Sequence, residues 1–190
     1  MKSRQLGRCS GVLGAAILMG CWFSVASADE KVAEWQAPVI SGYGYINPLP
    51  DADFQPDPEA DYKVAFDIAA GDPSAHAVNP GLWHVARVVN LFGTDGKPAK
   101  NLDIVVILHG SATRAVLKDD SYKARFGTTN PNVVLLGKLK DAGVKLYVCG
   151  QAIVDSGYYY QNVRDDIGVA LGALAAEIEL GAQGYTVMKL

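Results

Sequence analysis

The sequence predicts an α/β domain in which helices lie on both faces of a mainly parallel, roughly five-stranded sheet, a three-layer α/β/α arrangement. The first observation is that strand-like and helix-like segments alternate from residue 62 to the end of the chain. The second is that residues 102–108 are almost continuously apolar, as is typical of a strand covered on both faces. Alternation of this kind builds right-handed β-α-β crossovers, so neighbouring strands are expected to run parallel.

Five segments are expected to form the strands, because they are short and rich in β-branched, aromatic and aliphatic side chains. They are residues 62–68, 102–108, 144–148, 167–169 and 185–189.

Four segments are expected to be helical, namely residues 79–92, 132–142, 151–155 and 171–180. In the first, apolar side chains recur at helical spacing, Pro80 suits a first turn and Gly93 suits a stop. The second is closed by Gly143, and the last is rich in alanine.

The segment from Ser111 to Asn130 carries several basic side chains and has two interpretations. It is either a solvated charged helix or a cationic lid that folds over the edge of the sheet. A lid would suit a small anion such as an inorganic sulfur species. The basic residues concerned are Arg114, Lys118, Lys123 and Arg125.

Residues 1–28 have the pattern of a secretory signal. Lys2, Arg4 and Arg8 precede an uncharged apolar run of residues 11–25, and small residues at 26–28 suit cleavage. A membrane-spanning helix needs about 20 apolar residues, so this run is short for an anchor. The expectation is export to the periplasm as a soluble protein.

A lipoprotein is the alternative interpretation of the same segment. Leu18 to Cys21 resembles a lipobox, which would make Cys21 the lipidated N-terminus. Soluble export is favoured because Trp22, Phe23 and Val25 continue the apolar run beyond that cysteine.

Removal of residues 1–28 would leave 162 residues, enough for one domain with its own core. The net charge would be −6, from 14 basic and 20 acidic side chains. A nucleic-acid partner would require a basic surface, so none is expected.

Residues 29–61 differ in composition from the rest, since they hold five of the nine prolines. Proline fixes φ and cannot donate to a ladder, so regular structure is not expected there. Aromatic and aliphatic residues such as Trp35, Ile40 and Phe54 are too apolar for a free linker. We expect an extended arm packed on the domain or on a neighbouring subunit; the alternative is a disordered leader. The domain itself would comprise residues 62–190.

Residues with chemical functions follow three of the predicted strands. Asp67 lies at the end of the first, His109 and Gly110 follow the second, and Cys149 follows the third. Ligands bind outside the carboxyl ends of the strands in an open parallel sheet. These side chains are therefore expected to meet at one edge. His109 is interpreted as a base or an orienting group for the thiol, or as a structural residue. Asp67 is interpreted as a ligand-binding group, or as a loop cap or salt-bridge acceptor.

Cys149 is the only cysteine that would remain after removal of the signal, so it has no disulfide partner within the chain. It is either a buried structural residue or a nucleophile. The position of Cys149 favours a reactive thiol, because it lies just before the expected helix at residues 151–155 and a helix N-terminus stabilises a nearby anion. Gly150 and Gln151 are expected to supply backbone N–H groups to that anion.

Sequence motifs for common cofactors are absent. The chain contains no C-x-x-C, no G-x-G-x-x-G, no phosphate-binding G-x-x-x-x-G-K-[ST] and no H-E-x-x-H. The spacing of His76 and His84 matches no metal-binding pattern, and a zinc site would lack a second cysteine. The expectation is therefore neither cofactor nor metal.

Several segments together resemble the DsrE/DsrF-like proteins of the sulfur-relay fold. Residues 63–68 resemble that family's first strand, and residues 105–110 its second strand and turn. Residues 139–150 resemble its helix, strand and cysteine, while residues 90–92 and 183–185 match shorter motifs. The resemblance spans roughly residues 62–190.

The resemblance implies a homo-oligomer, often a trimer or hexamer, and a cysteine that carries sulfur as a persulfide. That role would fall on Cys149. The expected function is a periplasmic sulfur-handling protein, a possible sulfurtransferase or sulfur carrier, whose partner is a small sulfur species or a thiol protein. The alternative is a non-enzymatic oligomeric scaffold or small-ligand-binding protein. A weaker option is nucleotide or flavin binding, by analogy with other doubly wound sheets.

Overall fold

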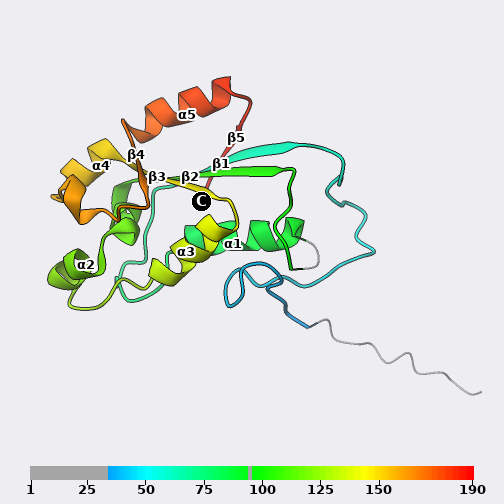
Figure 1. Cartoon of the computed structure of the whole chain (residues 1–190), viewed down its shortest axis with the longest axis horizontal. Helices are drawn as coiled ribbons and strands as arrows, with labels where there is room; N and C mark the ends of the chain where they lie inside the picture. Colours follow the sequence, from blue (N-terminus) through cyan, green and yellow to red (C-terminus); the bar gives the residue numbers. More distant parts are fainter. Residues whose placement is uncertain (1–33, 94–95) are drawn as a thin grey trace, which may run out of the picture. The chain divides into compact units, whose positions relative to one another are not determined.

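A five-stranded, all-parallel sheet with helices on both faces forms the domain (Figure 1). The computed structural model describes residues 34–93 and 96–190. The strand order is β4-β3-β2-β1-β5. The strands are β1 (Tyr62–Ile68), β2 (Leu102–Leu108), β3 (Lys145–Cys149), β4 (Gly168–Ala170) and β5 (Thr186–Lys189). The predicted three-layer α/β/α class is confirmed, whereas the predicted signal and Cys21 lie outside the described residues.

The register of the central strands brings their carboxyl ends to one edge. β1 pairs with β2 from Tyr62↔Leu102 to Ile68↔Leu108, and β3 ends beside β2 at Leu108↔Val148. The ladder continues one residue further, because the His109 N–H donates to the Ile68 carbonyl. Asp67, His109 and Cys149 therefore occupy adjacent positions along the same edge.

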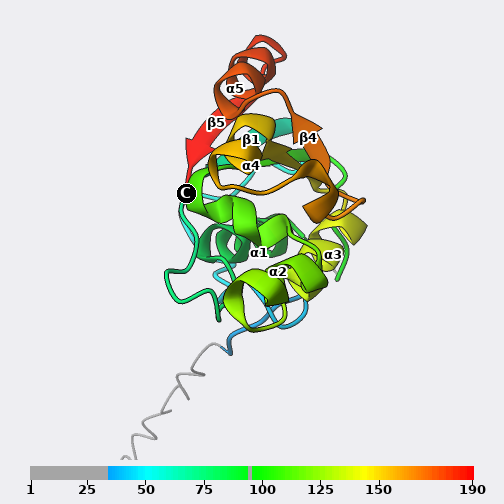
Figure 2. The same ribbon diagram turned by 90° about the vertical axis from the view of Figure 1, so that its left-hand side faces the viewer.

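The two faces of the sheet are covered unequally. Helices α1 (Pro80–Phe92) and α3 (Val133–Asp141) lie on one face, and α5 (Ala173–Ala182) lies on the other (Figures 1 and 2). Alternation of side chains along each strand sends large residues such as Phe66 and Leu108 toward α1 and α3. The α5 face receives smaller residues, such as Ala65, and forms a much smaller cluster. The sheet is thus firmly packed on one side and thinly covered on the other.

The segment after β2 forms two short helices that connect the edge of the sheet to α3. They are the 3₁₀ helix η1 (Gly110–Val116) and α2 (Asp119–Phe126). In α2 only Tyr122 is buried, so this helix matches the solvated alternative. Helix α4 (Gly150–Asp155) follows β3 directly, and a second 3₁₀ turn, η2 (Tyr160–Asn162), precedes β4.

The described part of the proline-rich segment, residues 34–61, has neither helix nor strand beyond one bridge between Gln36 and Ile46. Its first half packs on α1, where Ile40 is buried in the main core. Asn90 of α1 hydrogen-bonds four backbone groups of this half. Within residues 34–93 and 96–190, no helix combines the length and the apolar character that a bilayer crossing requires.

Candidate functional site

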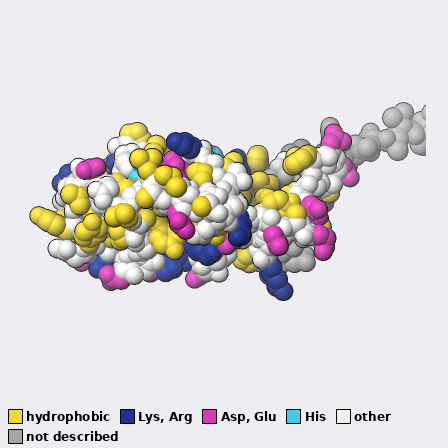
Figure 3. Space-filling view, turned by 90° about the horizontal axis from the view of Figure 1, so that it is seen from above, with side chains coloured by type: hydrophobic (Ala, Val, Ile, Leu, Met, Phe, Trp, Pro, Cys, Tyr) yellow, Lys and Arg dark blue, Asp and Glu magenta, His cyan; other side chains and the backbone are white. Residues whose placement is uncertain are grey.

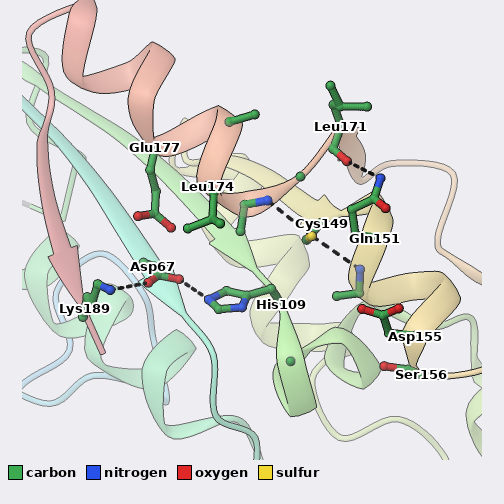
Figure 4. Close-up of a pocket in the computed structure, with 15 residues that line it drawn as sticks. Asp67, His109, Cys149, Gln151, Asp155, Ser156, Leu171, Leu174, Glu177 and Lys189 are labelled. Atoms are coloured by element: carbon green, nitrogen blue, oxygen red, sulfur yellow. Dashed lines mark hydrogen bonds and ion pairs between the residues drawn. The ribbon is translucent and has the colours of Figure 1, made fainter.

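An open cavity of about 830 Å³ lies at the carboxyl edge of the sheet, beside α4 and α5 (Figure 4). Five of the six sequence-predicted site residues line it, namely Asp67, His109, Gly110, Cys149 and Gln151. The remaining lining comes from α4, from β5 and above all from residues 171–177, which lead into α5.

The Cys149 thiol lies on the wall of this cavity and is largely covered by its neighbours. The residue is only 5% exposed and belongs to the small apolar cluster under α5. Its Sγ accepts backbone N–H groups from Ala152, at 3.4 Å, and from Ala173, at 3.3 Å. Both donors belong to first turns of helices, one in α4 and one in α5, and such groups stabilise negative charge. Two backbone N–H groups from different helices thus converge on the sulfur at the cavity wall.

The N–H donors differ from those expected. Gly150 is buried and does not line the cavity, and its Cα packs closely on β4, since a Cβ there would lie 2.9 Å from the Ala170 carbonyl oxygen. Gln151 lines the cavity, but its side-chain amide donates to the Leu171 carbonyl at 3.0 Å. The Ala173 donor comes from a helix 24 residues further along the chain, and no local pattern indicates it.

His109 is held by Asp67 rather than by the thiol. Its Nε2 contacts Oδ1 of Asp67, a carboxylate that is only 5% exposed. The other oxygen of Asp67 lies 3.8 Å from the Lys189 Nζ of β5. Within the described part of the chain, His109 makes no hydrogen bond to Cys149. A carboxylate that grips one imidazole nitrogen orients the ring, so Asp67 positions His109 in the cavity.

Gly110 allows the chain to turn at this point. Its φ is +51°, in the left-handed region, and an added Cβ would lie 2.8 Å from the Ala69 carbonyl oxygen. The residue therefore serves the sharp exit from β2 while lining the cavity.

Three charged residues of the cavity were missed by sequence reasoning: Asp155, Glu177 and Lys189. Glu177 approaches the His109–Asp67 pair. One potential ligand atom from each of Asp67, His109 and Glu177 lies within 4.8 Å of the other two. These are the described residues that could hold a metal ion. Glu177 sits in an alanine-rich helix and Lys189 in a terminal strand, and neither segment carries a motif that could have indicated the site.

A family model described as the DsrE/DsrF-like family matches residues 63–190. This chain belongs to the DsrE/DsrF-like family. The resemblance inferred from the sequence is thereby confirmed, and the matched range includes every residue of the cavity. A search of the curated proteins finds no match.

One solved structure with the same fold is a protein of unknown function from Methanobacterium thermoautotrophicum. It is 18% identical, with a TM-score of 0.50, and the match covers 68% of this chain and 100% of that one. At this identity the likeness supports the DsrE-like fold alone.

The cationic lid is not present in this DsrE-like domain. None of the four basic residues of the segment from 111 to 130 lines the cavity. Lys118 pairs with Asp165 at 2.7 Å, while the Arg114 and Arg125 guanidinium groups lie 5.7 Å from the rings of Phe126 and Tyr158. The reason is the path of the chain: η1 and α2 run toward the side of α1 and α3 (Figure 2).

Proposed function

We propose that this protein carries or transfers sulfane sulfur through a persulfide on Cys149. Membership of the DsrE/DsrF-like family suggests sulfur relay in general. The observation that carries the specific proposal is the placement of the Cys149 Sγ, on an open cavity and with two backbone N–H donors. A thiolate is the nucleophilic form of cysteine, and backbone N–H groups in the first turn of a helix are the kind of donor that stabilises an anion.

The reaction begins when the Cys149 thiolate attacks the outer sulfur of a persulfide donor, R–S–S⁻. A new sulfur–sulfur bond forms on Cys149, the donor's own sulfur–sulfur bond breaks, and R–S⁻ leaves with the electron pair. With thiosulfate as donor, the leaving group is sulfite. Neither exchange needs an external oxidant or a proton. Attack by an acceptor thiolate on the outer sulfur of the Cys149 persulfide then completes a transfer by the same chemistry.

The cavity supplies the surroundings that such an exchange needs. Leu171 and Leu174 contribute exposed apolar side chains to the cavity lining, and His109 and Lys189 contribute an imidazole and an amino group to it. His109 is held by Asp67, so its ring is fixed before a donor enters. This pairing supports a role for His109 in stabilising the leaving thiolate or sulfite.

Two further features belong to the proposal. The composition of residues 1–28 supports export to the periplasm.

The apolar side chains on α5, with Leu174 and Ile178 each 76% exposed, support a homo-oligomer whose contact includes this helix (Figure 3). The trimer or hexamer that the family resemblance implies is part of this proposal.

The test is to treat the folded protein with inorganic polysulfide or thiosulfate and to measure the mass of the peptide that contains Cys149. We expect a gain of one sulfur atom that a reductant removes, and no gain in Cys149→Ser. The proposal would be refuted if the Cys149 peptide of the folded chain stayed unmodified after treatment with polysulfide and also after treatment with thiosulfate.

A non-enzymatic binding or scaffold protein is the second candidate. The observation in its favour is that Cys149 is almost fully buried among small apolar side chains, as structural cysteines often are. A binding or scaffold function requires that iodoacetamide labels Cys149 more slowly at pH 7 than it labels an unstructured cysteine peptide. The sulfur proposal requires labelling at least as fast as that of the peptide.

A further inference from the structure

Three potential metal ligands from separate parts of the chain converge beside the thiol. Asp67 belongs to the end of β1, His109 follows β2, and Glu177 lies in α5. One ligand atom of each, a carboxylate oxygen or an imidazole nitrogen, lies within 4.8 Å of the other two. Figure 4 shows the Glu177 carboxylate directed toward the Asp67–His109 pair.

The negative charge at this point is only partly compensated. Asp67 is almost fully buried, and removal from water strengthens its repulsion with the nearby Glu177 carboxylate. Lys189 lies 3.8 Å from Asp67, but its side chain is 79% exposed. Among residues 34–93 and 96–190, Glu177 has no hydrogen-bond or ion-pair partner. The cluster would therefore gain from a further positive charge.

We propose that Asp67, His109 and Glu177 bind a divalent transition-metal ion of the zinc type. Three protein ligands, one imidazole and two carboxylates, leave a coordination position open, as in zinc sites that admit a small ligand. An imidazole ligand favours zinc-like ions over Mg²⁺ and Ca²⁺, which prefer oxygen. Lys189 lies 3.8 Å from the second oxygen of Asp67, on the outer side of the carboxylate, where partners of ligating carboxylates are found.

The sulfur of Cys149 is not one of the ligands. It lines the same cavity, but its contacts are the N–H groups of Ala152 and Ala173, and it is outside the group that converges within 4.8 Å. Binding of the ion therefore does not require the Cys149 thiol. A bound ion would present its open position to the cavity and would suit an anionic sulfur donor.

The test is calorimetric titration of Zn²⁺ into the untagged chain after treatment with a chelator. We expect one strong site, with at least tenfold weaker binding of Mg²⁺. Glu177→Gln should weaken Zn²⁺ binding at least tenfold. The matched control is Glu179→Gln, which changes an exposed acid on the same helix outside this cavity and should leave binding within twofold.

Cys149→Ser separates the ion from the thiol. It should bind Zn²⁺ as the parent does, and Co²⁺ in the parent should show no thiolate charge-transfer band. Circular dichroism establishes that each variant is folded, and Asp67→Asn offers a second ligand change. The proposal is overturned if the parent binds no zinc, if Glu177→Gln binds as tightly as Glu179→Gln, or if Cys149→Ser abolishes binding. Persulfide formation is measured separately, by mass spectrometry of the metal-free chain, so either proposal can fail without the other.

Discussion

At the scale of single residues, one buried amide attaches the N-terminal segment to the domain. The Asn90 Oδ1 accepts the backbone N–H groups of Val39 and Ile40, at 3.0 and 2.8 Å. Its Nδ2 donates to the carbonyls of Tyr43 and Gly44, each at 2.9 Å. Asn90 is fully buried, so water cannot readily replace its side chain as the hydrogen-bond partner of these four backbone groups.

Asn90→Ala should therefore lower the free energy of unfolding by about 3 kcal/mol or more, because several buried polar groups lose their partner. Urea denaturation at pH 7 measures the change. Asn101→Ala is the control: Asn101 also bonds two carbonyls of this segment, but it is partly exposed, and water can replace it at a cost below about 1 kcal/mol. Equal losses in the two variants would contradict the argument.

Replacement of glycine by alanine is expected to change the stability of the domain in opposite directions at two positions. At Gly150 an added Cβ would lie 2.9 Å from the Ala170 carbonyl oxygen, so β4 would have to move away from the thiol. We expect Gly150→Ala to destabilise the domain by about 1–3 kcal/mol.

Gly137 lies within α3, and an added Cβ there meets no atom within 4 Å. Gly137→Ala should stabilise the domain by about 0.5–1 kcal/mol, because alanine loses less backbone entropy in a helix. Thermal unfolding of both variants checks the pair, and a destabilised Gly137→Ala would be inconsistent with the open space around this position.

At the scale of elements, a polar cluster at the edge opposite the cavity joins β2, β3 and the residue that leads into β5. Asp103 of β2 accepts the Lys145 Nζ of β3 at 2.8 Å and the hydroxyl of Tyr185, which precedes β5, also at 2.8 Å. Burial alone would raise the pKa of Asp103, but the hydrogen bonds from Lys145 and Tyr185 outweigh it and hold the pKa below its ordinary value of 3.8. The hydrogen bond to Asp103 in turn raises the pKa of Lys145.

A lowered carboxyl pKa stabilises the folded chain above pH 3.8, and this contribution is lost as the pH falls through the folded-state pKa. Asp103→Asn should therefore lower the free energy of unfolding at pH 7, and the loss should become smaller as the pH falls. A double-mutant cycle with Lys145→Met isolates the pair, with an expected coupling of a few tenths to about 1 kcal/mol at pH 7. A coupling that stays unchanged as the pH falls through the folded-state pKa of Asp103 would rule out the ionic contribution.

At the scale of the whole domain, the unequal cover of the sheet explains where function gathers. The side of α1 and α3 holds the large aliphatic core, while the α5 side carries small residues and open space. Apolar side chains also remain exposed there, on and around α5 (Figure 3). A surface of this kind is typical of a protein contact, which is why the proposed oligomer uses this face.

Leu174→Glu combined with Ile178→Glu should dissociate the proposed oligomer, because two charges would be buried in an apolar contact. Sedimentation equilibrium gives the mass of each species. Val134→Glu, an exposed apolar position on α3, is the control and should leave the mass unchanged. A parent chain that sediments as a monomer would remove the oligomer from the proposal.

Much of the architecture could be predicted from local patterns. The predicted strand at 62–68 coincides with β1, and the predicted helix at 79–92 begins one residue later, with Asn79 as its cap. The register of parallel strands then brings Asp67, His109 and Cys149 together, as the strand-end rule anticipates. The helix expected from residue 171 begins instead at Ala173, because Gly172 is extended.

The order of residues was enough to establish the α/β class, the family and the edge at which the thiol lies, because these depend on periodicity and on the succession of strands. The groups that surround that thiol became visible only in the folded chain. The Ala173 N–H, Glu177 and Lys189 reach the cavity from α5 and β5, far along the chain. Their positions follow from how a helix packs across a sheet, which depends on contacts distant in sequence that no local pattern records.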